Sequence, residues 1–162
     1  RLVYLTQTTL SLDETKGIVD VLQRRFPKMQ GPPAQDICYA TENRQLAVKA
    51  IAPRIQLLLV VGSQNSSNSR RMVEVCRNLN VQSFLVDDEY ELNPSWFVGV
   101  ETVGVTAGAS APEHLVQRLI AHVQALYGFG TVEEVEVKDE DVKFSLPGEL
   151  QRAAAALTQI ST

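Results

Sequence analysis

The chain has 162 residues and a formal net charge of −4, with 44% hydrophobic and 21% charged residues. This is the balance of an ordinary globular protein, and the absence of a Lys- or Arg-rich run argues against a nucleic-acid partner. The apolar run Ile55–Val61 is interrupted by Gln56 and is too short to span a membrane, so we expect no membrane partner either.

The chain begins with Arg1 rather than Met and continues directly into an apolar run. We therefore expect a fragment of a longer protein, without a signal peptide. Its two cysteines, Cys38 and Cys76, can form at most one disulfide, which favours a reduced, intracellular setting. Two cysteines also cannot supply four ligands to a metal centre by themselves.

Three segments repeat one plan, in which an apolar run is followed by a hydroxyl-rich turn and then by an amphipathic stretch. The runs with their turns are Val3–Ser11, Leu57–Ser69 and Thr102–Ser110, and the helical stretches extend to Phe26, Leu79 and Tyr127. Short apolar strands that alternate with helices predict an α/β fold, with a parallel sheet covered by helices on both faces. The turns after such strands gather at the carboxyl edge of the sheet, where ligands bind.

Further elements follow from local signals. Ser11 and Ser110 each precede a glutamate by three residues, which is the capping-box pattern of a helix start. We also expect a helix over Glu42–Ile51, which ends before a proline, and a strand over Ser83–Val86.

Two boundaries divide the chain. The Gly-Pro-Pro sequence that begins at Gly31 indicates a linker. We assign residues 1–30 to a strand–helix unit of a preceding αβα domain, 31–130 to the C-terminal αβα domain and 131–162 to a C-terminal tail. In the tail, Thr131–Val137 and Val142–Leu146 indicate a hairpin, and Gln151–Ile160 is either a helix or a frayed end.

The turn Gly62–Ser69 contains Ser, Asn and Gln in seven of its eight positions, directly after a run of Leu and Val. At the start of a helix, Ser and Asn side chains join unpaired backbone N–H groups to suit a phosphate or a diphosphate. The alternative is that these residues only cap the helix and form the turn. A second turn of small and hydroxyl residues, Thr106–Ser110, should lie beside the first and adds weight to anion binding.

The two cysteines have different contexts. Cys38 lies in a short loop before a helix, where a thiol can act as a ligand or nucleophile, or simply as a small buried apolar group. Cys76 shares a helix face with Met72 and Leu79, which predicts core packing. His114 and His122 lie eight residues apart on one helix, so we do not expect a shared metal site.

Several blocks of the sequence together resemble the LytB family of 4-hydroxy-3-methylbut-2-enyl diphosphate reductases. The match is spread over nearly the whole chain, and its blocks are Thr6–Thr9, Asp36–Thr41 with Asn43–Gln45, Gly62–Ser69, Gly104–Pro112 and Phe144–Leu150. The resemblance implies a trefoil of three similar αβα units around a 4Fe–4S cluster. It also implies an oxidoreductase of the non-mevalonate isoprenoid pathway, which makes isopentenyl and dimethylallyl diphosphates.

The resemblance assigns roles to individual residues. It implies that Cys38 is one of three cluster-ligating cysteines. It implies that Ser66, Ser67, Asn68 and Ser110 hold the substrate diphosphate. Thr8 matches a residue near the reacting hydroxyl, in the network that delivers protons.

The chain departs from the family in length. It is about half as long as a family member and lacks the N-terminal part with the other two cysteines, so we expect the isolated chain to hold no stable cluster and to be inactive. The implied partners are that N-terminal part, the allylic diphosphate and an electron donor such as flavodoxin or ferredoxin, in a bacterial cytoplasm or a plastid. Two alternatives are a phosphate- or diphosphate-binding module with no redox role, and a flavodoxin-like or receiver-type regulatory domain.

Overall fold

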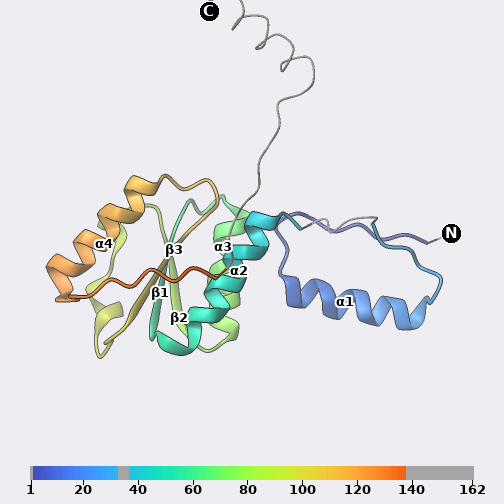
Figure 1. Cartoon of the computed structure of the whole chain (residues 1–162), viewed down its shortest axis with the longest axis horizontal. Helices are drawn as coiled ribbons and strands as arrows, with labels where there is room; N and C mark the ends of the chain where they lie inside the picture. The colour runs from blue at the N-terminus through green and yellow to red at the C-terminus, as the bar shows by residue number, and fades with distance from the viewer. Residues whose placement is uncertain (1, 33–36, 138–162) are drawn as a thin grey trace, which may run out of the picture.

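A computed structural model describes residues 2–32 and 37–137 of the chain. Its centre is a parallel sheet in the order β2-β1-β3, built from β1 (Leu57–Val61), β2 (Gln82–Val86) and β3 (Val103–Ala107). In register, Leu57 lies opposite Gln82 on one side and Val103 on the other. All five residues of β1 are buried, because this strand has a neighbour on each side and helices on both faces (Figure 1).

Helices cover both faces of the sheet, as predicted. On one face, α2 (Tyr39–Ile51) and α3 (Ser67–Asn78) share a core with Leu58 and Val60 of β1. On the other face, α4 (Glu113–Tyr127) packs on the alternate β1 residues Leu57, Leu59 and Val61. The single-turn helices η1 (Ala52–Arg54), η2 (Glu89–Glu91) and η3 (Pro94–Phe97) complete the elements of the described chain.

The α4 face is reinforced by stacked aromatic rings. The Phe97 and Tyr127 rings stack at 3.8 Å between centroids, and the Phe84 and Trp96 rings at 3.7 Å. Together they join β2, η3 and the end of α4 into one layer.

The N-terminal segment differs from the prediction. The capping box at Ser11 is confirmed, since its hydroxyl accepts a hydrogen bond from the Glu14 N–H at the start of α1 (Leu12–Arg25). The strand predicted before it is wrong, because the only bridge described there joins Val3 to Gln30. A strand needs a neighbour along its length, and the described residues provide none here. α1 lies beyond α2 and α3, away from the sheet (Figure 1). None of its own residues is buried.

Other boundaries also shift. α2 begins at Tyr39 rather than Glu42, and its N-cap is Cys38. The capping box at Ser110 is wrong: α4 begins after Pro112, and no side chain caps it.

The C-terminal tail agrees only in part with the prediction. Residues 131–137 form no strand, and the remaining predictions for the tail lie outside the described residues. Among the helices that the structure describes, none combines the length and the apolarity needed to cross a membrane.

Candidate functional site

The hydroxyl-rich turn after β1 leads into the N-terminus of α3. Ser66 is the N-cap, and its hydroxyl oxygen accepts hydrogen bonds from the Ser69 N–H at 3.2 Å and from the Ser69 hydroxyl at 3.0 Å. A hydroxyl offers two lone pairs and one proton. Since both lone pairs of Ser66 are used, its O–H remains available to donate to a ligand.

The first turn of α3 offers further donors. Among the described residues, no acceptor pairs with the backbone N–H of Ser67 or of Asn68. These groups carry the partial positive charge of a helix N-terminus, which attracts anions. Ser67 is exposed, so its hydroxyl also faces solvent at this end of the helix.

Asn68 is the least expected residue of this turn. Its side chain is 7% exposed, and neither its Nδ2 nor its Oδ1 atom has a hydrogen-bond partner in the described chain. A buried amide without partners costs about 1–3 kcal/mol. An unpaired amide beside unpaired N–H groups therefore marks a place built for a polar ligand.

Ser69 joins the turn after β1 to the turn after β3. A Cβ atom on Gly62 would lie 2.4 Å from the Ser69 hydroxyl oxygen, and a Cβ atom on Gly108 would lie 2.3 Å from it. Both glycines follow strand ends that are closed by backbone bonds, Gly62 N–H to Val86 and Gly108 N–H to Val61, each at 2.9 Å. The two glycines thus let the hydroxyl-rich turns approach each other around one buried serine.

This contact predicts a coupled stability effect. Gly108→Ala should lower the free energy of unfolding by about 1–3 kcal/mol, because the new methyl group overlaps the Ser69 hydroxyl. Ser69→Ala alone should cost about 1 kcal/mol, through the lost hydrogen bond to Ser66. The double variant should lose less stability than the two single losses added together. Once the Ser69 hydroxyl is removed, the Ser69 Cβ lies 3.6 Å from the added Cβ, which is an ordinary contact. Urea unfolding of the four proteins measures this, and simple additivity would contradict the described packing.

Ser110 lies in the turn that leaves β3. That turn is closed by a hydrogen bond from the Ala111 N–H to the Gly108 carbonyl at 3.0 Å, and Ser110 itself is exposed. Because Ser110 does not cap α4, its hydroxyl is available at the same edge of the sheet as the α3 N-terminus.

Cys38 and Thr8 are neighbours in the structure. The Cys38 N–H donates to the Thr8 carbonyl at 3.2 Å, and both residues are exposed. The interpretation of Cys38 as a buried apolar group is therefore wrong: Cys38 is the N-cap of α2 and is exposed. The thiol is accessible at the end of α2 that faces the segment containing Thr8.

Sequence reasoning gave no role of its own to Gln45, which fixes that segment. Gln45 is fully buried, its Oε1 accepts from the Leu12 N–H at 3.1 Å and its Nε2 donates to the Leu10 carbonyl at 2.8 Å. Both contacts lie more than thirty positions away along the chain, and the only sequence signal was a polar residue on the inner side of α2.

Cys76 is confirmed as a core residue. It is fully buried on α3, and burial raises the pKa of its thiol to about 11 despite a hydrogen bond with Ser83. A thiol with so high a pKa is not a ready metal ligand at neutral pH. Within the described ranges, no group of three or more His, Cys, Asp or Glu side chains could hold a metal ion. Among the described residues, Cys38 is therefore the accessible thiol, and no complete metal site is formed around it.

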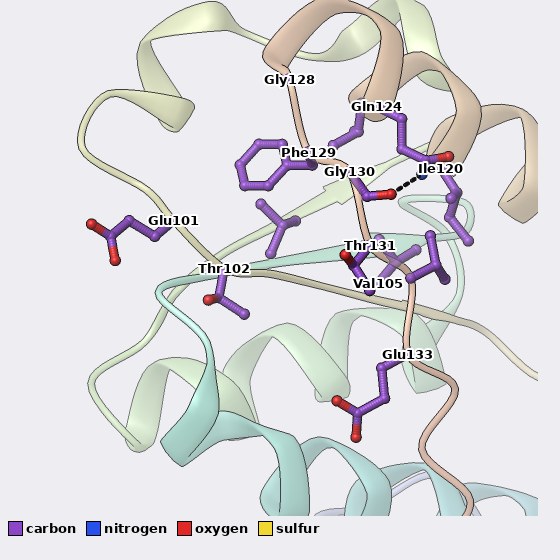
Figure 2. Close-up of a pocket in the computed structure, with 13 residues that line it drawn as sticks. Glu101, Thr102, Val105, Ile120, Gln124, Gly128, Phe129, Gly130, Thr131 and Glu133 are labelled. Carbon is purple, nitrogen blue, oxygen red and sulfur yellow. Dashed lines mark hydrogen bonds between the residues drawn. The ribbon is translucent and has the colours of Figure 1, made fainter.

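Two cavities of similar volume lie beside β3, away from these turns. Figure 2 shows a cavity of about 490 Å³ between α4, β3 and the segment that leaves α4. Its lining includes Glu101 and Thr102 at the amino end of β3, and it includes none of the predicted site residues. The candidate site is thus the group of turns at the carboxyl edge and not this cavity.

Fold and site define a parallel α/β unit with an uncharged, hydroxyl- and amide-bearing site at the carboxyl edge of its sheet. The model of the LytB protein family matches residues 1–124 of the chain. The chain therefore belongs to the LytB protein family.

Curated relatives agree with this assignment. Proteins named 4-hydroxy-3-methylbut-2-enyl diphosphate reductase from Dechloromonas aromatica and Acidothermus cellulolyticus are 52% and 54% identical to it, over 149 and 157 residues. The matches cover 92% and 96% of this chain but 48% and 46% of those proteins. The chain thus spans about half the length of the curated relatives it matches.

Solved structures give the same picture. The E-1-hydroxy-2-methyl-but-2-enyl-4-diphosphate reductase of Plasmodium falciparum matches with a TM-score of 0.87 and 30% identity, over 98% of this chain and 50% of that one. A second structure, of (E)-4-hydroxy-3-methyl-but-2-enyl diphosphate reductase, matches with a TM-score of 0.54 and 31% identity. These matches confirm the predicted α/β class.

Proposed function

We propose that this chain is the diphosphate-binding half of a reductase that converts 4-hydroxy-3-methylbut-2-enyl diphosphate to isopentenyl and dimethylallyl diphosphates. In this reaction a C–O bond is replaced by a C–H bond, with two electrons and two protons consumed and water released. The names of the curated relatives support the activity. The site described above supports the assignment of the diphosphate to this half.

The observation that carries the proposal is the buried, unpaired amide of Asn68 at the N-terminus of α3. A diphosphate can accept from its Nδ2, from the free N–H groups of the first turn and from the Ser66 hydroxyl. We assign Ser66, Ser67, Asn68 and Ser110 to the diphosphate. Neutral donors suit this task, because they hold the anion in a fixed position and leave the reacting end of the substrate oriented.

We assign Thr8 to the other end of the substrate. Its backbone contact with Cys38 sets the two residues side by side. A threonine hydroxyl can both accept and donate a proton, so it can pass a proton to the departing hydroxyl group. Thr8 is the catalytic residue that this chain would contribute.

Cys38 is the residue that would ligate a 4Fe–4S cluster, as an exposed thiol at the end of α2. The cluster would supply electrons and a Lewis acid for the substrate hydroxyl. The remaining ligands would come from an N-terminal half of the same enzyme, and the electrons from a donor such as flavodoxin or ferredoxin. The bacterial relatives favour a bacterial cytoplasmic setting over a plastid one.

Turnover kinetics of the complete enzyme test the proposal. Ser110→Ala should raise KM about tenfold and lower kcat by no more than that factor, since the lost hydrogen bond holds the substrate before and during the reaction. The matched control is Ser95→Ala, a change of an exposed serine on η3 that should leave both constants unchanged. Wild-type kinetics for Ser110→Ala would remove that turn from the substrate site.

A further inference from the structure

Arg44 lies on α2 and makes one long-range hydrogen bond, to the end of β3, and one within its own helix. Its Nε donates to the Ala107 carbonyl at 3.1 Å, and its Nη1 donates to the Ala40 carbonyl at 3.4 Å. Ala40 lies in the first turn of α2, two residues after Cys38. Ala107 ends β3 and is followed directly by the turn with Gly108 and Ser110.

The position of Ala107 explains why its carbonyl is free for this contact. β3 is an edge strand of the described sheet, and the neighbouring Gly108 N–H points inward to Val61 of β1. Successive residues of a parallel strand direct their backbone groups to opposite sides. The Ala107 carbonyl therefore points away from β1, where the Arg44 guanidinium reaches it from α2.

The charge of Arg44 is not balanced by a carboxylate within the described part of the chain. The guanidinium is half-buried, and both of its described acceptors are neutral carbonyls. By contrast, Arg71 pairs with Glu14 and Glu74, and Arg118 pairs with Glu89. Arg77 likewise donates only to a neutral carbonyl, that of Ser83, but Arg44 is the one of the two beside the candidate site, and it retains N–H groups that could serve an anion.

We infer that Arg44 is a positioning residue of the diphosphate site: it holds the Ser110 turn against the Cys38 turn, and its unbalanced charge favours the bound anion. This inference rests on the proposed function. The hydrogen bond to Ala107 ties α2, which begins directly after Cys38, to the turn that contains Ser110, and the bond to Ala40 orients the guanidinium on its own helix. The charge adds to the neutral donors of α3 without replacing them.

Two substitutions in the complete protein separate these contributions. Arg44→Gln removes the charge and the fork of N–H groups, whereas Arg44→Lys keeps the charge but cannot bridge both carbonyls in the same way. Titration with inorganic diphosphate should show an affinity about tenfold weaker for Arg44→Gln and within about threefold of wild type for Arg44→Lys. In turnover, Arg44→Lys should restore KM but not kcat, because the spacing of the two turns stays disturbed.

The control variant is Arg24→Gln on α1, whose guanidinium contacts only the Asp20 carbonyl of its own helix among the contacts described. It should bind diphosphate as wild type does, with the same dependence on salt. Diphosphate binding by Arg44→Gln should depend less on salt concentration than binding by wild type or by Arg24→Gln, since one charge has been removed from the site.

The outcomes separate this inference from the proposed function. If Ser110→Ala weakens diphosphate binding and Arg44→Gln does not, the proposed function stands and the role of Arg44 is wrong. If Arg44→Lys binds diphosphate as weakly as Arg44→Gln, the charge contribution is wrong. If the wild-type protein binds no diphosphate, both fail. Should Arg44→Gln not fold, Arg44→Lys still tests the positioning role, because wild-type kcat in that variant would contradict it.

Discussion

Replacing Cys38 by serine in the complete enzyme should abolish the visible absorption of an iron–sulfur cluster after anaerobic reconstitution. Loss of residues that merely support metal ligands costs about 10–100-fold in activity or affinity, so loss of a ligand should lower turnover by at least about a hundredfold. The matched control is Cys76→Ala, because Cys76 is buried in the core with a raised pKa and should not contact a cluster. Absorption spectra, iron and sulfide analysis and turnover check both variants.

One result would contradict this assignment of Cys38, and another would contradict the expectation that the isolated chain holds no stable cluster. Unchanged absorption and turnover in Cys38→Ser would favour a phosphate- or diphosphate-binding module without a redox role. A full four-iron complement on the isolated chain would show that it needs no ligands from outside. The described residues contain one accessible thiol and no group of three metal-binding side chains.

Replacing Asn68 by leucine should separate binding from stability. The amide is buried without a partner, so an apolar side chain of similar size should leave the free energy of unfolding unchanged or raise it. The same change should weaken diphosphate binding by about 10–100-fold, since a buried donor to the anion is lost and its place is taken by an apolar group. Urea unfolding without ligand and KM in turnover measure the two effects.

Asn68→Asp is the companion variant. A carboxylate at a helix N-terminus is favourable for folding but repels a bound diphosphate, so binding should again fall while the fold is kept. If Asn68→Leu instead lowers the free energy of unfolding by about 2 kcal/mol or more, the amide must have a partner in the folded protein. The amide would then no longer indicate a ligand at this position.

Much of the fold was predictable because it depends on local patterns. A run of consecutive Leu and Val predicted the buried central strand β1, and the polar residues directly after it predicted a turn that leads into a helix, α3, although the helix begins earlier, at Ser67. Ser11 caps α1 as its sequence context indicates. Such signals act within a few residues and need no knowledge of distant contacts.

The errors arose where tertiary contacts decide the outcome. The apolar run from Val3 could not become a strand without a neighbouring strand to pair with. Pro112 shifted the start of α4 beyond the reach of the Ser110 hydroxyl. The assignment of residues 1–30 to a preceding domain, and the trefoil of three units, stay predictions. The exposed Ile18 and Phe26 of α1 are compatible with that division of the chain.

The candidate site was only partly predictable for the same reason. The hydroxyl-rich turns were visible as composition, but their junction at Ser69 depends on two glycines from different strands. The bridge from Arg44 to Ala107 joins residues 63 positions apart, and no periodicity in the sequence indicates it. The unpaired state of Asn68 likewise depends on what surrounds it in the fold.

The central claim is that this half of the enzyme binds the diphosphate through the turns after β1 and β3. Calorimetric titration of inorganic diphosphate into the complete, cluster-free protein tests it most directly, with wild type, Ser67→Ala/Ser110→Ala and the control Ser95→Ala. We predict saturable binding to wild type and to Ser95→Ala, and an affinity at least about tenfold weaker for the double variant, which loses one hydroxyl from each turn. Equal affinity in all three proteins, or no binding to wild type, would contradict the claim.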